Sequence, residues 1–393
     1  MKILVTGGGS GGHITPILAV AHELKQLRPE AEIIYVGQTG DRLLDVPEQD
    51  PNIDRVLTIR AGKFRRYHGE GLKQLLDIVT LYKNLRDAIW TLVGVWQSFK
   101  LLGQIRPDVI FVKGGFVGVP VGLAAALRGI PFVTHDSDAL PGLANRLIAR
   151  WAKVHAVALP KEVYAIYPPK KTVTVGVPIP SHFHLVSKAE NEAWRKQLDL
   201  DDADQVVFVT GGGNGADRLN KAVMGCAPEL LERYPGLKIV HVTGRQLEDD
   251  ARRRYKQLLS QGDQGRVTVK GFISNLYQYS GVADVVITRA GATSMAEFAA
   301  QAKACIVVPN PQLTGGHQLK NAKVMADRKA IRLVSEENLK NEPRALMPAL
   351  TELLDHPAKA RALGEKLAEL AQPNAAHLLA MVLLEVAEGS PRR

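Results

Sequence analysis

Short apolar runs alternate with longer amphipathic stretches along the whole chain. Runs of strand length stand at 3–6, 33–36, 109–112 and 132–134, and again at 206–210, 239–242, 267–269, 285–288, 306–308 and 331–334. Most are separated by stretches whose apolar residues recur at helical spacing, such as 16–27 and 219–231. Strands that alternate with helices favour parallel sheets with right-handed crossovers. The pattern therefore predicts an α/β protein with doubly wound sheets.

The chain also contains an internal repeat. The sequence Val5–Gly12 recurs as Val209–Ala216, and each copy follows an apolar strand and precedes a helical pattern. The repeat predicts two tandem Rossmann-like domains, over residues 1–180 and 190–370, with the linker between Pro178 and Glu190. A last helical pattern within 375–393 can pack back on either half, and packing on the N-terminal domain is our prediction.

Composition excludes several classes of protein. The chain has 393 residues, of which 46% are hydrophobic and 23% charged, as in a folded globular protein. Its two cysteines, Cys226 and Cys305, are too few for a metal cluster or a disulfide framework. No signal peptide is expected at the N-terminus. The longest uncharged apolar stretch, Val117–Leu127, is shorter than the roughly 20 residues that a membrane-spanning helix needs.

The charge points to an anionic partner. The formal net charge is +10, and residues 60–113 alone carry ten basic and four acidic residues. A basic excess of this size favours nucleic acid, a phosphorylated metabolite or an anionic lipid. No nucleic-acid-binding motif accompanies the charge, so we expect no nucleic acid partner.

Both repeats carry a glycine-rich turn. Gly7, Gly9 and Gly12 satisfy G-x-G-x-x-G, and Gly211, Gly213 and Ala216 satisfy its G-x-G-x-x-A variant. Such turns let backbone N–H groups approach an anion at a helix N-terminus. The ends of the second strands carry no acidic residue to hold the ribose of a nicotinamide or flavin dinucleotide, and no Walker-type motif is present. The loops therefore predict a phosphate-bearing ligand of another class.

Further polar residues cluster where parallel strands should end, which is the ligand side of such sheets. His13 closes the first glycine turn. In the first half, Lys113 and His135 each begin a four-residue segment that follows a strand, 113–116 and 135–138. In the second half Arg289 leads into a helix that carries Glu297. The spacing of Asp202 and Asp204 fits a metal-binding Asp-x-Asp, but the pair precedes its strand, so we interpret it as a solvated turn.

Taken in order, these motifs resemble the peptidoglycan N-acetylglucosaminyltransferases of the MurG family. The resemblance spans Gly7–His13, Gly114–Pro120, His135–Arg146, Gly211–Ala216, Phe272–Leu276, Arg289–Glu297 and His317–Ala322. It implies the GT-B fold, in which two Rossmann-like domains face a cleft. It also implies an inverting transfer of N-acetylglucosamine from UDP-GlcNAc to undecaprenyl-diphosphate-linked N-acetylmuramoyl-pentapeptide, with neither a metal ion nor a cofactor.

The resemblance assigns roles to individual residues. Glu297 would accept hydrogen bonds from both ribose hydroxyls, and His13 would be the base that deprotonates the acceptor hydroxyl. The residues implicated on the donor side are Gly212, Gly213, Asn214, Phe272, Ile273, Ala292, Thr293, Glu297, Gln318 and Asp138. Those expected to face the acceptor and its diphosphate are Gly8, Gly9, Ser10, Gly11, Gly12, Lys113, Gly115 and His135.

Three motifs depart from the family pattern. His135–Asp138 stands where His-Glu-Gln-Asn is usual, Gly213-Asn214 where Ser-Gln is usual, and Pro180 replaces an arginine. These changes leave the donor sugar and the acceptor open. The alternatives are a glycosyltransferase acting on another lipid, a UDP-sugar 2-epimerase, and a non-catalytic nucleotide-sugar sensor.

The basic segment 63–96 combines cations with apolar residues at helical spacing. Its apolar members are Leu72, Leu75, Leu76, Val79, Tyr82, Ile89, Trp90, Val93 and Trp96, interleaved with Lys63, Arg65, Arg66, Lys73, Lys83 and Arg86. Such a surface suits anionic lipid, although a core helix with a solvated basic face fits the same pattern. A polyprenyl-linked acceptor favours lipid, which predicts a peripheral protein at the cytoplasmic face of the cell membrane.

Overall fold

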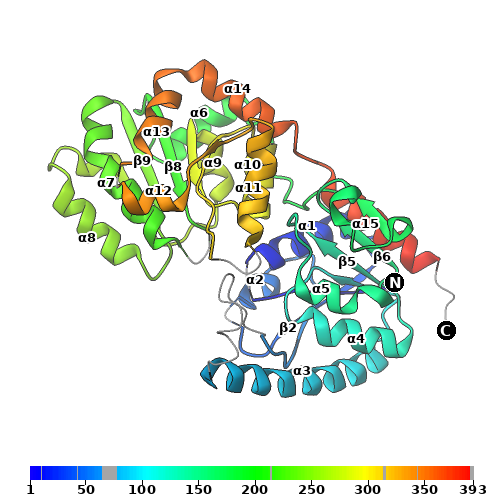
Figure 1. Cartoon of the computed structure of the whole chain (residues 1–393). Coiled ribbons are helices and arrows are strands. Elements are labelled where there is room, and N and C mark those ends of the chain that lie inside the picture. The colour runs from blue at the N-terminus through cyan, green and yellow to red at the C-terminus, as the bar shows by residue number, and fades with distance from the viewer. Residues whose placement is uncertain are drawn as a thin grey trace. The chain divides into compact units, whose positions relative to one another are not determined.

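A computed structural model of the chain describes residues 1–9, 11–41, 43–63, 78–212, 215–312, 316–342 and 344–389 (Figure 1). The residues group into two compact units. The first comprises Met1–Ser181, Gln312–His317 and Gln372–Arg393, and the second comprises His182–Pro311 and Gln318–Ala371. Each unit is built on one parallel sheet with helices on both faces, which confirms the predicted pair of tandem Rossmann-like domains.

The first unit contains a seven-stranded sheet in the order β3-β2-β1-β4-β5-β6-β7. Its strands are β1 (Lys2–Thr6), β2 (Glu32–Gln38), β3 (Arg55–Ile59), β4 (Val109–Val112), β5 (Phe132–Asp136), β6 (Val154–Val157) and β7 (Thr172–Thr174). Strand order reverses between β1 and β4, where Thr6 lies opposite Val112. The loops that follow these two strands therefore meet at the switch point, where such sheets bind ligands.

Helices cover both faces of this first sheet because the central strands are apolar on both sides. Ile3 and Val5 of β1 pack with α1 (Gly11–Leu27) and α15 (Ala375–Glu388), whereas Leu4 packs with α3 (Ile78–Ile105) and α4 (Gly118–Arg128). The C-terminal helix α15 contacts α1 and β4, which is the packing predicted for it (Figure 1). Shorter helices are α2 (Asp45–Glu48), α5 (Leu143–Ile148), η2 (Ala149–Trp151), η3 (Lys161–Tyr164) and η4 (Pro169–Lys171).

The second unit contains a six-stranded sheet in the order β10-β9-β8-β11-β12-β13. Its strands are β8 (Gln205–Thr210), β9 (Leu237–Val242), β10 (Val267–Lys270), β11 (Val285–Thr288), β12 (Ala304–Val307) and β13 (Arg332–Leu333). Its helices are α6 (Lys188–Gln197), α7 (Asp217–Arg233), α8 (Glu248–Leu258), η5 (Gln264–Arg266), α9 (Leu276–Val282), α10 (Ala292–Ala300), α11 (His317–Asp327), α12 (Glu336–Asn341), α13 (Met347–Asp355) and α14 (Pro357–Ala368). The switch point lies between β8 and β11.

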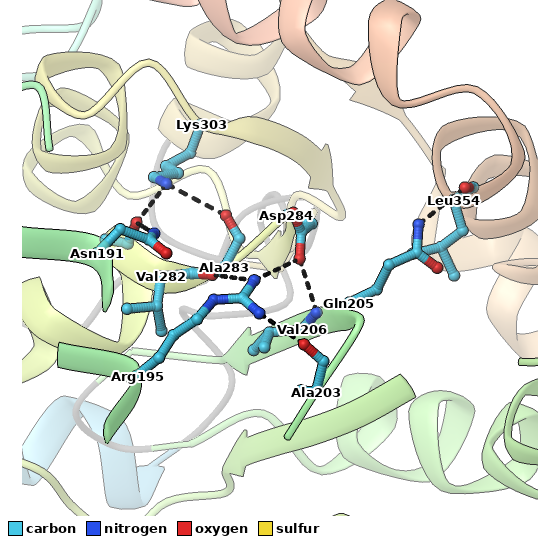
Figure 2. A network of polar contacts seen from close by, with 11 residues as sticks. Asn191, Arg195, Ala203, Gln205, Val206, Val282, Ala283, Asp284, Lys303 and Leu354 are labelled. Carbon is cyan, nitrogen blue, oxygen red and sulfur yellow. Dashed lines mark hydrogen bonds and ion pairs between the residues drawn. The ribbon is translucent and has the colours of Figure 1, made fainter. Parts of the chain in front are cut away.

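Polar contacts join the amino ends of the strands in the second sheet (Figure 2). Arg195 of α6 donates to the carbonyl of Ala203 at 2.7 Å and to the carboxylate of Asp284 at 3.3 Å. That carboxylate also accepts the backbone N–H of Val206 at 2.7 Å, and Lys303 donates to the carbonyls of Gly281 and Ala283. The network thus fixes α6 and the starts of β8, β11 and β12, at the edge opposite the glycine loop.

The Asp-x-Asp segment lies at this same amino edge. Asp202 forms an ion pair with Lys238, and it precedes β8 rather than following it. Asp202 is therefore far along the strand from the carboxyl end that carries the glycine loop. In the described part of the chain, no helix is both long enough and apolar enough to cross a membrane.

Candidate functional site

The two loops at the switch point of the first sheet pack closely because they contain glycine. Gly7–Gly9 follow β1, and Gly114 and Gly115 follow β4 with φ of 113° and 75°. A Cβ atom on Gly115 would lie 2.8 Å from the carbonyl oxygen of Gly8, and one on Gly9 would lie 2.7 Å from the ring of Phe116. Side chains at Gly9 and Gly115 would therefore force the loops apart. Gly11 and Gly12 are exposed at the start of α1, and Ser10 lies outside the described residues.

Two residues that the sequence analysis missed hold the first glycine loop. The hydroxyl of Tyr35 donates to the carbonyl of Gly7 at 2.5 Å, and the carboxylate of Asp41 accepts the N–H of Gly9 at 3.1 Å. An anion that approached Gly9 would therefore meet an N–H group already engaged by a carboxylate. Neither residue belongs to a motif: Tyr35 lies within β2 and Asp41 in the loop that follows it, so only the pairing of β2 with β1 brings them to this loop.

His13 lies in the first turn of α1 and is half-buried. Burial, the largest cause, and the positive charge of Lys113 together lower the pKa of its imidazole to about 4. The imidazole is therefore neutral at pH 7. Its Nδ1 atom is buried and has no hydrogen-bond partner among the residues that the structure describes.

Lys113 follows β4, and its backbone N–H donates to the carbonyl of Thr6 at 2.9 Å. The residue is only 3% exposed, and burial lowers the pKa of its ammonium group, whereas the carboxylates of Asp138 and Asp136 raise that pKa. Within the described ranges, no residue accepts a hydrogen bond from the ammonium or forms an ion pair with it. The first unit thus holds a buried cation beside its glycine loops.

The end of β5 and the helix α5 present two hydrogen-bond acceptors that remain unused. Nε2–H of His135 donates to the carbonyl of Gly176 at 2.8 Å, which leaves Nδ1 as an acceptor. The side-chain amide of Asn145 donates to the carbonyl of His135 at 2.9 Å, which leaves its Oδ1 as an acceptor. Both acceptors are buried and lack partners in the described part of the chain. Unsatisfied buried acceptors of this kind indicate a polar ligand or bound water.

Asp136 and Asp138 differ in their roles. The carboxylate of Asp136 accepts from the N–H of Gly142 at 2.9 Å and from the hydroxyl of Tyr167 at 2.7 Å, so it fixes the loop. Asp138 is half-buried, and its backbone carbonyl accepts from Tyr164 at 3.0 Å. Asp138 belongs to the first unit, whereas the other residues predicted to bind the donor belong to the second.

The glycine loop of the second unit joins β8 to α7. Gly212 and Gly215 have φ of 84° and 73°, and a side chain on Gly215 would overlap the carbonyl oxygen of Thr243. The amide of Asn220 donates to that same carbonyl at 2.9 Å. The N-terminus of α7 thereby faces the carboxyl edge of the sheet, where it can receive an anion. The predicted residues Gly213 and Asn214 lie outside the described residues.

A chain of hydrogen bonds between buried polar side chains stabilises this loop. Oδ1 of Asn220 lies 3.1 Å from Nε2 of His241, and Nδ1 of His241 lies 2.8 Å from the hydroxyl of Tyr255. Because Asn220 donates through its amide to Thr243, its oxygen must accept from His241, so His241 carries its proton on Nε2. Burial lowers the pKa of His241 to about 3, which keeps the ring neutral.

Glu297 lies one turn into α10, which begins at Ala292 just after β11. Its side chain is 8% exposed, and burial raises the pKa of the carboxyl group to about 8. No described residue forms a hydrogen bond or ion pair with it. Ala292 and Thr293 are half-buried in the first turn of the same helix. The site therefore presents an unpartnered carboxyl group at the carboxyl edge of the sheet.

The remaining donor-side residues lie on neighbouring loops of this edge. The N–H of Asn310 donates to Oε1 of Gln318 at 2.9 Å, which orients the side-chain amide. Phe272 is half exposed, and the guanidinium of Arg245 lies 4.4 Å from the centre of its ring. Ile273 packs on the core of the second sheet.

Arg289 is a buried residue at this same carboxyl edge of the second sheet. It donates to the carbonyl of Val308 at 3.0 Å and to the carboxylate of Glu336 at 2.9 Å. The sequence pattern placed Arg289 after a strand, but it gave no partner for its charge. The contact with Glu336 shows that Arg289 links the end of β11 to α12.

Comparison with known proteins defines the family. The chain matches the glycosyltransferase family 28 N-terminal domain over residues 3–157 and the glycosyltransferase family 28 C-terminal domain over residues 206–379. Two curated relatives are both named UDP-N-acetylglucosamine--N-acetylmuramyl-(pentapeptide) pyrophosphoryl-undecaprenol N-acetylglucosamine transferase. The relative from Natranaerobius thermophilus is 32% identical over 87% of this chain and 88% of its own. The relative from Symbiobacterium thermophilum is 33% identical over 99% of this chain and 97% of its own.

Solved structures share the fold. The crystal structure of MurG from Acinetobacter baumannii has a TM-score of 0.69 at 23% identity and covers 98% of this chain and 99% of its own. The UDP-GlcNAc 2-epimerase from Neisseria meningitidis has a TM-score of 0.65 at 14% identity, over 98% of this chain and 100% of its own. Because the matched domains and the curated relatives span nearly the whole chain, the chain belongs to glycosyltransferase family 28, among the relatives named as N-acetylglucosamine transferases.

Proposed function

We propose that this chain transfers N-acetylglucosamine from UDP-N-acetylglucosamine to the C4 hydroxyl of undecaprenyl-diphosphate-linked N-acetylmuramoyl-pentapeptide in peptidoglycan synthesis. The observation that carries the proposal is the 33% identity, over 99% of the chain, to a curated transferase of that name. The carboxyl edges of the two sheets support it, since one presents an anion-binding loop with a carboxyl group and the other a histidine with a buried cation.

The second unit binds the donor in this proposal. The diphosphate of UDP lies at the glycine loop before α7, where the helix N-terminus supplies N–H donors and a positive field. The ribose hydroxyls bond to Glu297, whose carboxyl group is buried without another partner in the described chain. Phe272 and Ile273 contact the uracil, Gln318 contacts the sugar, and Ala292 and Thr293 line the pocket beside Glu297.

The first unit binds the acceptor and supplies the base. The neutral imidazole of His13 removes the proton from the C4 hydroxyl, whose oxygen then forms a bond to C1 of the donor sugar as the bond from C1 to the diphosphate breaks. UDP leaves with the electron pair of that bond. The N-terminus of α7 stabilises the negative charge that develops on the diphosphate. The acceptor's own diphosphate lies against the loops that contain Gly8 and Gly115.

The outer face of α3 forms the membrane surface in this proposal. Its exposed apolar residues are Tyr82, Leu85, Ile89, Leu92, Trp96 and Phe99, which recur at intervals of three and four and so form one stripe. Cations flank it: Arg60 lies over Trp90, Lys100 over Trp96 and Arg128 over Phe99 at 4.1, 3.7 and 3.9 Å. Residues 64–77 of the predicted segment lie outside the described residues.

The charge of α3 favours anionic lipid as the occupant of this stripe. The acidic residue of α3, Asp87, is 4% exposed and pairs with Arg86 at 3.1 Å, so the exposed charges on the helix are positive. Apolar side chains flanked by cations suit a bilayer surface that contains anionic lipid. The chain therefore works as a peripheral protein at the cytoplasmic face of the membrane, where its polyprenyl-linked acceptor lies.

The direct test supplies labelled UDP-GlcNAc and the lipid-linked acceptor in detergent, with UDP-glucose, UDP-galactose and UDP-GalNAc as competing donors. We expect selective transfer of N-acetylglucosamine. Transfer of another sugar would show that the donor is not UDP-GlcNAc. Asp138→Asn and Asn214→Gln, which restore the usual family residues, would then be the first variants to test. Conversion of UDP-GlcNAc without acceptor would indicate an epimerase, and UDP binding without any product would indicate a sensor.

A further inference from the structure

Lys113 is a buried cation that the fold leaves without a counter-ion in direct contact. Its side chain is 3% exposed, and across the described residues nothing accepts a hydrogen bond from its ammonium. A buried ammonium group is costly unless it is paired, and the nearby charges of Asp138 and Asp136 offset this cost only through space. Lys113 is therefore placed to receive an anionic group from a ligand.

The position of Lys113 also links it to His13. A Cβ atom on Gly7 would lie 3.4 Å from Cβ of Lys113 and 3.0 Å from the backbone oxygen of His13, so both residues flank the same glycine. A Cβ atom on Gly115, two residues after Lys113, would lie 3.3 Å from the imidazole ring of His13. An anion held by Lys113 would thus lie beside the imidazole.

We propose that the ammonium group of Lys113 binds the diphosphate of the acceptor, and that this contact converts His13 from a weak into an effective proton acceptor. The inference rests on the proposed function and adds a regulatory link to it. The base would gain strength only when an acceptor is in place, so the empty enzyme would hold an inactive base.

Three titratable groups act on the charge of His13. These are Lys113 after β4, Asp138 after β5 and His317 from the segment Gln312–His317 of the same unit. Burial and the positive charge of Lys113 both lower the pKa of His13, and Asp138 raises it. A diphosphate would neutralise the field of Lys113 and add negative charge of its own, and both effects raise the pKa of the imidazole.

The experiment uses the full chain with UDP present, so that the glycine loop of the second unit is occupied, and inorganic pyrophosphate as the probe. NMR of ¹³C-labelled histidine follows the titration of His13, whose signal is identified by its loss in His13→Asn. In the unmodified chain, pyrophosphate should raise the pKa of His13 by about one unit or more. In Lys113→Met, pyrophosphate should bind at least about tenfold more weakly, because a charge-assisted contact is lost, and the shift should disappear.

Matched variants separate this role from a structural one. Lys161→Met removes an exposed lysine of the same unit and should behave as the unmodified chain. Lys113→Arg keeps the charge and should retain both pyrophosphate binding and the shift. Unchanged thermal unfolding of the full chain in Lys113→Met, and in the milder Lys113→Gln, shows that the first unit still folds, and unchanged UDP affinity shows the same for the second.

Three results would overturn the inference: no pyrophosphate binding to the unmodified chain, equal binding to Lys113→Met, or an equal titration shift in that variant. None of these readouts requires turnover. Failure of sugar transfer with an intact pyrophosphate response would therefore reject the proposed function alone, and normal transfer without the response would reject the inference alone.

Discussion

At the scale of single residues, Glu297 combines burial with an unpartnered carboxyl group. Its pKa of about 8 lies above the ordinary value of 4.5, so the folded, ligand-free protein holds a proton there at neutral pH. The folded state therefore loses stability as the pH rises from about 4.5 to about 8, because the unfolded chain has already released that proton. A ligand that hydrogen-bonds the ionised form would recover part of this loss.

This gives a prediction for the pH dependence of donor binding. A carboxylate accepts from two ribose hydroxyls, whereas a protonated carboxyl group cannot use both oxygens as full acceptors. UDP affinity should therefore rise between pH 6.5 and 8, by at most about tenfold per pH unit, with release of a proton on binding. Isothermal titration calorimetry in buffers of different ionisation enthalpy measures both quantities.

Glu297→Gln is the control for that measurement. Its amide has the same shape but no titration, so UDP affinity should be weaker and nearly independent of pH. A variant that kept the pH dependence of the unmodified chain would assign the proton to another group and contradict the role of Glu297.

At the scale of elements, the apolar pattern predicted the central strands because they are buried on both faces. It missed the two edge strands of the first sheet, β3 and β7, and the internal strand β6. β3 begins with Arg55 and is partly exposed, β6 contains His155, and β7 is a threonine-rich strand of three residues. β3 and β7 are edge strands, which bury one face or less, so their sequences need not be continuously apolar. β6 is buried between β5 and β7, but its four residues include a histidine and so form no continuous apolar run. These three strands form because they pair with a neighbouring strand, and a local sequence pattern does not show such pairing.

The apolar spacing of helix α3 is compatible with two different environments. Its spacing fits both a core helix and a surface helix, and only the structure shows that the stripe from Tyr82 to Phe99 is exposed. If this stripe contacts lipid, Leu92→Glu should lower binding to phosphatidylglycerol-containing vesicles by about tenfold or more. The change removes an exposed apolar side chain that lipid would bury, and it adds a charge that anionic lipid repels. Vesicle sedimentation measures the change.

The matched control for the stripe lies on the opposite face of the same sheet. Leu378→Glu changes an exposed leucine of α15, which packs against α1 rather than α4, and should leave vesicle binding unaltered. Equal losses in Leu92→Glu and Leu378→Glu, or none in either, would refute α3 as the lipid-binding element.

At the scale of the whole molecule, the internal repeat was enough to predict two domains of the same kind. Both glycine loops follow the first strand of their sheets, and the segments carrying Lys113 and Glu297 follow the strands paired with these. The strand order explains why motifs distant in sequence meet at one edge. The supporting residues Tyr35, Asp41 and Asn220 could not be predicted, because their function depends on tertiary contacts rather than on a motif.

The central claim assigns the base to the first unit and the nucleotide to the second, and paired kinetics with UDP binding test it most directly. His13→Ala should lower the turnover number at least about a hundredfold with UDP affinity nearly unchanged. Glu297→Ala should instead weaken UDP binding. Loss of UDP affinity in His13→Ala, or unchanged UDP affinity in Glu297→Ala, would contradict this division of roles.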